Sequence, residues 1–176
     1  MAHTTLALVV VLGAACGSVD SEGADGGTGG DVDAPPVIDM AGVYSLTVTN
    51  GANGCQVVDW IVGQSTANLP LTVTQDGEMV FGEIGGVLGT WVETVVGSRT
   101  FIGTISGSAF QMTLVGERDV TEEMCTYRVR ATVDGTSDGD LISGTIEYTK
   151  VIDASQPCAA LDGCITSQTF NGTRPP

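Results

Sequence analysis

Basic residues are scarce in this 176-residue chain, which has six lysines and arginines against 21 aspartates and glutamates. The formal net charge of −15 repels nucleic-acid phosphates, so we expect no nucleic-acid partner. The same charge argues against membrane binding through a polybasic surface. An acidic excess of this size is typical of a protein that stays soluble outside the cell.

The first fifteen residues contain no aspartate, glutamate, lysine or arginine. Their apolar run, Leu6 to Leu12, is shorter than the roughly 20 residues of a transmembrane helix and has the length of a signal-peptide core. Three small residues then lead directly into Cys16. This arrangement resembles the lipobox of bacterial lipoproteins, in which the signal is cleaved before the cysteine and the cysteine is acylated. An ordinary secretory signal cleaved near Ala15 is the alternative.

The lipobox resemblance implies a location for the chain. Residues 1–15 would be a signal peptide, and the lipid on Cys16 would hold the protein at a membrane, since each buried methylene contributes about 0.8 kcal/mol. Gly17 follows the cysteine, whereas Asp at this position retains such lipoproteins at the inner membrane. We therefore expect an exported protein anchored to the bacterial outer membrane, on its periplasmic or its surface-facing leaflet.

The stretch 16–39 has the composition of a tether. It holds six glycines and six acidic residues after Cys16, and no basic residue. Because its few apolar groups cannot offset the entropy of ordering the backbone, the sequence predicts a flexible, disordered linker. Pro35 and Pro36 stiffen the end of this linker before the domain begins at about residue 40.

Residues 40–176 show the period-two alternation of half-buried strands. The alternation is found in 43–49, 69–74, 110–115, 124–133 and 141–149. Turn dipeptides such as Asn53-Gly54, Asp76-Gly77 and Asp134-Gly135 separate the runs, and no stretch has sustained helical periodicity. The sequence predicts one small all-β domain, an antiparallel meander of about eight strands.

Glycine recurs inside the expected strands, in Phe81-Gly-Glu-Ile-Gly, Ile102-Gly-Thr-Ile-Ser-Gly and Ile142-Ser-Gly-Thr-Ile. A strand glycine usually marks a bend or a close approach of another group. Regularly placed glycines favour a strongly coiled sheet that closes on itself. We therefore expect a small antiparallel barrel, with a β-sandwich as the alternative.

Two resemblances concern this domain. Gly42-Val43-Tyr44 resembles the Gly-x-Trp of the first lipocalin strand, with Tyr in place of Trp, and Arg174 stands near the place of the lipocalin partner arginine. This implies a lipocalin-like barrel and no particular ligand. The whole layout, with its acidic linker and a tail containing Cys158-x5-Cys164, resembles bacterial lipoproteins of unknown function, a family that implies no activity.

The five cysteines are Cys16, Cys55, Cys125, Cys158 and Cys164. Acylation of Cys16 leaves an even set of four, which suits disulfide formation in an oxidising compartment. Of the three possible pairings we expect Cys55–Cys125 and Cys158–Cys164, the second closing a loop of only seven residues. Zinc binding is not expected, because there is no Cys-x2-Cys pair.

Loss of His3 with the signal would leave the mature chain without histidine. This removes Ser-His-Asp and Cys-His catalysis and histidine metal ligation. The single lysine, Lys150, stands at a strand end and is expected to be solvated. We therefore predict a protein that is not an enzyme and has no cofactor.

Carboxylates are the remaining candidates for chemistry. A pair drawn from Glu83, Glu93 and Glu147 would suit glycoside hydrolysis, but we expect these side chains to face solvent. Asp134, Asp138 and Asp140 lack the spacing of a calcium loop and favour a polar hairpin turn. We predict no metal site.

Two functions remain. The first is a non-enzymatic envelope lipoprotein, a tethered structural or interaction module whose partner is an unidentified envelope protein. The second is a carrier of a small apolar ligand, with Trp60 and Trp91 at the barrel mouth. A carrier needs an interior cavity of a few hundred Å3, whereas large apolar residues on the inward faces favour a filled core.

Overall fold

The computed structural model describes residues 36–122, 125–152, 158 and 163–175, and the side chains of all of these except Trp91 and Val95. The predicted signal peptide, Cys16 and the linker up to Pro35 lie outside these residues.

Nine strands and one helix follow one another along the described chain. They are β1 (Gly42–Asn53), β2 (Ser65–Asp76), β3 (Met79–Ile84), α1 (Gly86–Val96), β4 (Thr100–Ser106), β5 (Ala109–Val115), β6 (Val120–Glu122), β7 (Cys125–Ser137), β8 (Leu141–Ile152) and β9 (Thr166–Thr173). Every described residue of the five stretches with predicted alternation lies in a strand, so the all-β prediction is confirmed.

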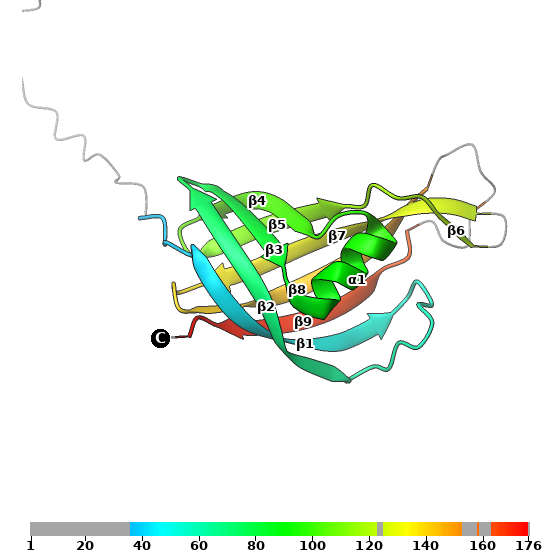
Figure 1. The fold of residues 1–176 in the computed structure, drawn as a ribbon, viewed down its shortest axis with the longest axis horizontal. Coiled ribbons are helices and arrows are strands. Elements are labelled where there is room, and N and C mark those ends of the chain that lie inside the picture. Colours follow the sequence, from blue (N-terminus) through cyan, green and yellow to red (C-terminus); the bar gives the residue numbers. More distant parts are fainter. Residues whose placement is uncertain (1–35, 123–124, 153–157, 159–162, 176) are drawn as a thin grey trace, which may run out of the picture. The chain divides into compact units, whose positions relative to one another are not determined.

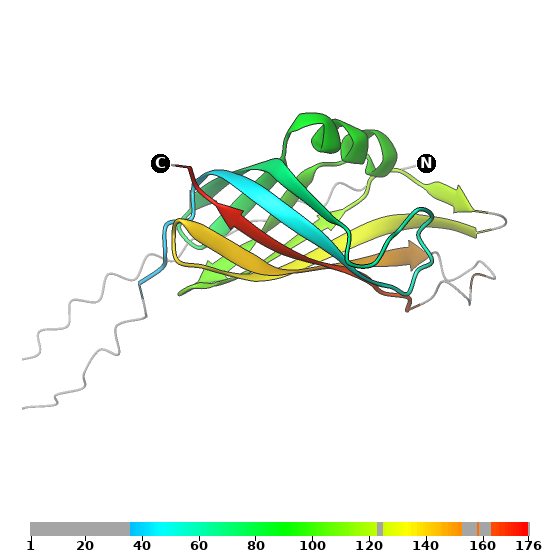
Figure 2. The ribbon, with the colours of Figure 1, turned by 90° about the horizontal axis from the view of Figure 1, so that it is seen from below.

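Eight of the strands close into one antiparallel barrel (Figures 1 and 2). Strands β1 to β5 pair in sequence order, β5 pairs with β7, and β7, β8 and β9 continue the meander. Strand β9 then pairs with β1, which closes the sheet, while the short β6 pairs only with the beginning of β7. A β-sandwich would leave its two sheets unpaired at their edges, so the predicted barrel is confirmed over the sandwich.

Large inward-facing side chains fill the barrel. The core includes Tyr44, Leu46, Leu71, Val73, Val80, Phe101, Ile105, Phe110, Met112, Leu114, Val133, Ile142, Ile146 and Phe170. They come from all eight barrel strands, as the period-two pattern predicts. Burial of these side chains is the main stabilising contribution to the fold.

Glycines in the strands allow close packing in the barrel. Gly103 lies opposite Met112, Gly135 opposite Phe110, and Gly144 opposite Phe170. A side chain at Gly135 would come within 2.5 Å of Cζ of Phe110, and one at Gly144 would meet the backbone oxygen of Asp134. The predicted role of the strand glycines, close packing in a coiled sheet, is therefore confirmed at Gly103 and Gly144, whereas a methyl group at Gly82 would fit at ordinary contact distances.

Helix α1 was not predicted from the sequence. Its sequence, GVLGTWVETVV, is rich in glycine and β-branched residues, which have low helix propensity. Tertiary packing compensates, because Val92 and Val96 lie against the barrel core. Gly97 ends the helix in the left-handed region, with φ of 89° and its N–H donating to the carbonyl of Glu93. Within the described segments, no helix has the length and apolarity needed to cross a membrane.

One end of the barrel, here called the arginine end, is closed by Arg174. Its Nη2 donates to the hydroxyl of Tyr44 at 2.9 Å, and its guanidinium lies over the Tyr44 ring at 5.4 Å. The Tyr44 hydroxyl is also within hydrogen-bond distance of the carbonyls of Met40 and Gly139. The hydrogen bond that Arg174 donates to Tyr44 is the main reason that the pKa of Arg174 is raised. Arg174 therefore contacts Tyr44, the residue in place of the lipocalin Trp, as the lipocalin resemblance implies.

Substituting Gly144 with alanine is expected to destabilise the barrel by about 1–3 kcal/mol, because the new methyl group would press on the backbone of β7. Gly82→Ala is the matched control, since its methyl group would meet Leu71 and Met112 at ordinary distances of 3.4 Å or more. Urea unfolding with the disulfides intact compares the two variants. Equal losses in both would contradict this account of the glycines.

Candidate functional site

The other end of the barrel carries both disulfides and is called here the disulfide end. It comprises the last residues of β1 and β8, the first residues of β7 and β9, and loop 54–64 between β1 and β2 (Figure 1). Cys55 is bonded to Cys164, and Cys125 to Cys158. All four cysteines predicted to form disulfides do so.

The predicted pairing is wrong, and the strand register gives the reason. Strand β1 runs antiparallel to β9, with Asn53 opposite Thr166, so Cys55 and Cys164 meet just beyond this pair. Strand β7 runs antiparallel to β8, with Tyr127 opposite Ile152, so Cys125 at the start of β7 lies beside the end of β8, six residues before Cys158 in the sequence. The two closed loops span 109 and 33 residues of sequence separation. By the chain-entropy relation they contribute about 5 and 4 kcal/mol.

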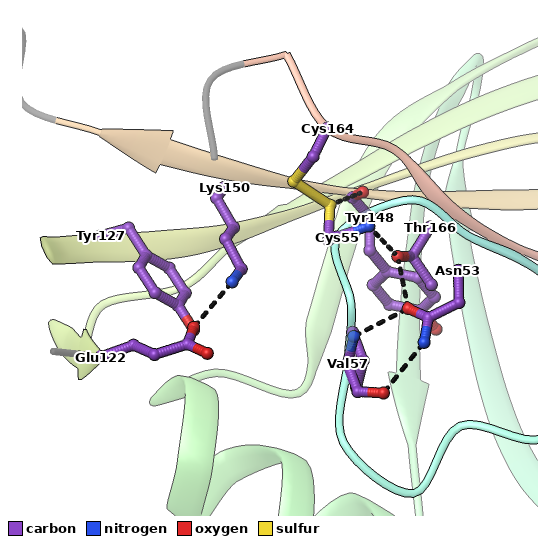
Figure 3. Close-up of a disulfide and its surroundings, with 9 residues drawn as sticks. All are labelled: Asn53, Cys55, Val57, Glu122, Tyr127, Tyr148, Lys150, Cys164 and Thr166. Carbon is purple, nitrogen blue, oxygen red and sulfur yellow. Dashed lines mark hydrogen bonds and ion pairs between the residues drawn. A yellow bond between two sulfur atoms is a disulfide. The ribbon is translucent and has the colours of Figure 1, made fainter. Parts of the chain in front are cut away.

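Loop 54–64 is held at its base by the Asn53 side chain (Figure 3). Its Nδ2 donates to the carbonyl of Val57 at 2.9 Å, and its Oδ1 accepts from the N–H of Val57 at 2.7 Å. The Thr166 hydroxyl donates to the same Oδ1 and accepts from the N–H of Cys55 at 3.0 Å. These bonds, together with the Cys55–Cys164 disulfide, join the loop to β9.

The second half of the loop is fixed by Asn50 and Trp60. Asn50 exchanges backbone hydrogen bonds with Gln64 and Gly63, and its side chain donates to the carbonyl of Ile61. The indole of Trp60 donates to the carbonyl of Gly51 at 3.0 Å and packs edge-on against Tyr148. Trp60 therefore holds the loop against the barrel, while the side chain of Trp91 is not among those described.

The loop presents apolar side chains to solvent. Val57, Val58, Ile61 and Val62 are between 42% and 79% exposed. Large aliphatic groups are usually buried, and an exposed cluster of them marks an interaction site. Sequence reasoning missed this feature, although Val57-Val58-Asp59-Trp60-Ile61-Val62 is an apolar run without strand alternation, located between turn residues.

Two residues of the loop other than glycine have left-handed backbone conformations. The φ angles are 55° at Gln56 and 62° at Asp59. Each costs on the order of 1 kcal/mol for a residue that is not glycine, so the surrounding contacts must maintain them. Asp59 is exposed in the middle of the apolar run and has no ion-pair partner among the residues described.

Lys150 lies inside the disulfide end, and the prediction that it is solvated is wrong. Its side chain is only 9% exposed because position 150 shares the inward face of β8 with Ile146 and Tyr148. The ammonium donates to Oε2 of Glu122 at 2.8 Å and lies 4.4 Å from the centre of the Tyr127 ring (Figure 3). The hydrogen bond from Lys150 is the main cause that lowers the pKa of Glu122.

Two tyrosines at this end are polar groups within an apolar environment. Burial raises the pKa of Tyr127 and, more strongly, that of Tyr148. The Tyr148 hydroxyl donates to Gln168 at 2.6 Å, and Gln168 in turn donates to Asn50. The chain of hydrogen bonds satisfies these buried groups and links the barrel wall to the base of loop 54–64.

The barrel interior leaves little free space. One cavity of about 40 Å3 lies within the core, lined by ten apolar side chains that include Phe110 and Phe170. A ligand pocket for a small organic molecule usually measures about 300–1,000 Å3. The prediction that inward side chains fill the core is therefore confirmed. An open hollow of about 400 Å3 lies on the outer wall over β4, β5 and β7, next to Gln111 and Asp134.

The carboxylates singled out in the sequence do not form a centre. Glu83, Glu93 and Glu147 are exposed, as predicted. Asp138 accepts from the N–H groups of Asp140 and Leu141, so it belongs to a hairpin turn, as the sequence favoured. Over the described part of the chain, no group of three His, Cys, Asp or Glu side chains is placed to hold a metal ion.

Comparison with known proteins identifies no family for this chain. No family model matches the chain, and no curated protein matches it. A solved structure, that of EF1p2_mFAP2b bound to DFHBI, aligns with 77% of this chain and 94% of its own, at 12% identity and a TM-score of 0.41. A similarity of this size does not carry an argument about function.

Non-reducing peptide mapping is expected to recover Cys55 joined to Cys164 and Cys125 joined to Cys158. Removing the first pair by double alanine substitution should cost about 1 kcal/mol more stability than removing the second, because it closes the longer loop. Recovery of Cys55 joined to Cys125 would overturn the assignment of the disulfide end.

Glu122→Gln is expected to lower stability at neutral pH by about 1 kcal/mol, since it leaves the Lys150 charge without its partner. The pKa of Glu122 is lower folded than unfolded, so the pair stabilises fully above the ordinary value of 4.5. This contribution is lost as the pH falls through the lowered pKa, and the variant should then match the wild type. Urea unfolding at neutral pH and at a pH below the lowered pKa measures this difference. The double variant Glu122→Gln/Lys150→Met is the control, and we expect it to regain stability at neutral pH.

Proposed function

We propose that this protein is a non-enzymatic lipoprotein of the cell envelope, tethered through a lipid on Cys16 and acting as an interaction or structural module at the outer membrane. The filled barrel favours an interaction or structural module over a ligand carrier. Its interior cavity of about 40 Å3 is far below the size of a ligand pocket. The signal-like residues 1–15 and the acidic stretch that follows support the tether.

The non-enzymatic part of the proposal is supported by where the reactive groups lie. The carboxylates considered for glycoside chemistry are exposed on the outer surface. The inward Lys150 is already paired with Glu122 and lies against Tyr127. Tyr148 and Gln168 are bonded to one another. The polar groups at the disulfide end thus satisfy each other, as structural groups do.

Labelling with radioactive palmitate tests the tether. The wild-type chain, expressed in its own host, should carry the label, and Cys16→Ala should not. Both proteins must be present in equal amounts by immunoblot. An unlabelled wild type would mean that residues 1–15 are an ordinary secretory signal.

Native mass spectrometry of the full chain, purified from its host membranes in detergent, separates the module from the carrier. A module should have the mass of the polypeptide with its covalent lipid only. A carrier should show an additional apolar molecule that dissociates on collisional activation while the covalent lipid stays. A bound molecule of this kind would contradict the filled-core proposal and favour the carrier.

A further inference from the structure

We propose that loop 54–64 docks into a protein partner that presents an apolar recess bordered by a basic side chain. The inference rests on the proposed function as an interaction module and names the surface and the partner chemistry. It is carried by the shape of the loop, by its single unpaired charge and by its position on the barrel.

The shape of the loop favours a concave partner. Val58, Ile61 and Val62 project from one connection that is braced by a disulfide and by the side chains of Asn50 and Asn53. A second convex copy of the loop could not enclose them. Four partly exposed aliphatic side chains supply only part of the roughly 800 Å2 per partner that a stable, flat dimer interface buries. A recess instead surrounds such a loop and removes its aliphatic groups from water.

The charge of the loop favours a basic border on that recess. Asp59 is the loop's one charged residue, and it stands between the two pairs of apolar residues. No described basic side chain is paired with Asp59, and three of them are engaged elsewhere: Arg99 with Glu83 and Glu93, Arg128 with Asp119, and Lys150 with Glu122. A partner that buries Asp59 must supply a cation, because an unpaired buried carboxylate is costly.

A lipid surface fits the loop less well than a protein does. Insertion into a bilayer would take Asp59 into a low-dielectric medium, and the loop has no basic residue to contact lipid phosphate. The Trp60 indole, the usual interfacial anchor, is held on Gly51 and against Tyr148. The net charge of −15 also repels anionic lipid.

The position of the loop leaves it free for a partner in the aqueous envelope. The first described residues lie at the arginine end. There the N–H of Ile38 donates to the carbonyl of Gly107, and the carbonyl of Ile38 accepts a hydrogen bond from the Gln75 side chain. Loop 54–64 lies at the opposite end of the barrel (Figure 1). With Cys16 in a membrane, residues 17–35 have a fully extended reach of about 65 Å, so the loop can point away from the anchor.

Photo-crosslinking in the protein's own host tests the proposal. Benzoylphenylalanine replaces Val58 in the full-length chain, and Leu141, which is 52% exposed near the arginine end, is the matched control position. Irradiation should yield one discrete protein adduct from position 58 and at least about fivefold less from position 141. Asp59→Lys should reduce the adduct at position 58 at least about fivefold, whereas Asp76→Lys, at another exposed acidic site, should leave it unchanged.

The decisive step is a charge exchange. The cross-linked segment of the partner should contain apolar residues beside a lysine or arginine. Replacing that basic residue of the partner with glutamate should restore the adduct with the Asp59→Lys variant. Absence of an adduct, or an adduct indifferent to Asp59, overturns the proposal. So does an adduct of twice the mass of this chain. Flotation of the Cys16→Ala protein with phosphatidylethanolamine–phosphatidylglycerol vesicles, lost on Val58→Asp, would assign the loop to a membrane instead.

The outcome separates this inference from the proposed function. An adduct that depends on Asp59 supports docking even if palmitate labelling fails. A labelled protein without an adduct leaves the lipoprotein proposal intact and removes the docking loop. Unchanged circular dichroism and intact disulfides in each variant establish that a lost adduct does not reflect unfolding.

Discussion

The pairing of β1 with β9 is the constraint on which both ends of the molecule depend. It is the longest-range strand pairing among the described residues, and it joins the two ends of the meander into a closed barrel, so that only the short β6 is left as an edge strand. At the arginine end it brings Arg174, just after β9, onto Tyr44 of β1. At the disulfide end it places Cys164 beside Cys55. The pairing of the first and last strands thus forms the Arg174–Tyr44 contact at the arginine end and the Cys55–Cys164 disulfide at the other end.

Closure also determines what the interior can hold. In a small coiled barrel the inward faces converge, so phenylalanine and methionine side chains require glycine on the neighbouring strand. The alternation of large and small residues leaves only a small apolar cavity. The core therefore stabilises the barrel and offers little room for a ligand.

Local patterns in the sequence predicted the strands, the barrel and the close packing at Gly103 and Gly144, because side-chain alternation and steric crowding act over a few residues. The disulfide pairing was wrong because it depends on which strands become neighbours. Following the predicted meander to its closure would place the end of the first strand beside the start of the last, and so Cys55 beside Cys164. Helix α1 was missed because its propensity is low and its stability comes from packing. Lys150 was expected to be solvated because it stands near a strand end, and its burial depends on a partner, Glu122, that is 28 residues away in the sequence.

Loop 54–64 differs from the core because its apolar side chains are exposed and are not stabilised by burial. Its exposed aliphatic side chains and the left-handed conformations of Gln56 and Asp59 are unfavourable in the isolated chain. The disulfide, the Asn53 and Asn50 hydrogen bonds and the Trp60–Tyr148 contact hold it nevertheless. The entropy of ordering the loop is therefore lost during folding, where the core compensates for it, and not on association. A loop ordered in advance can bind through a few side chains, whereas a flexible loop of the same composition would lose that binding energy to ordering.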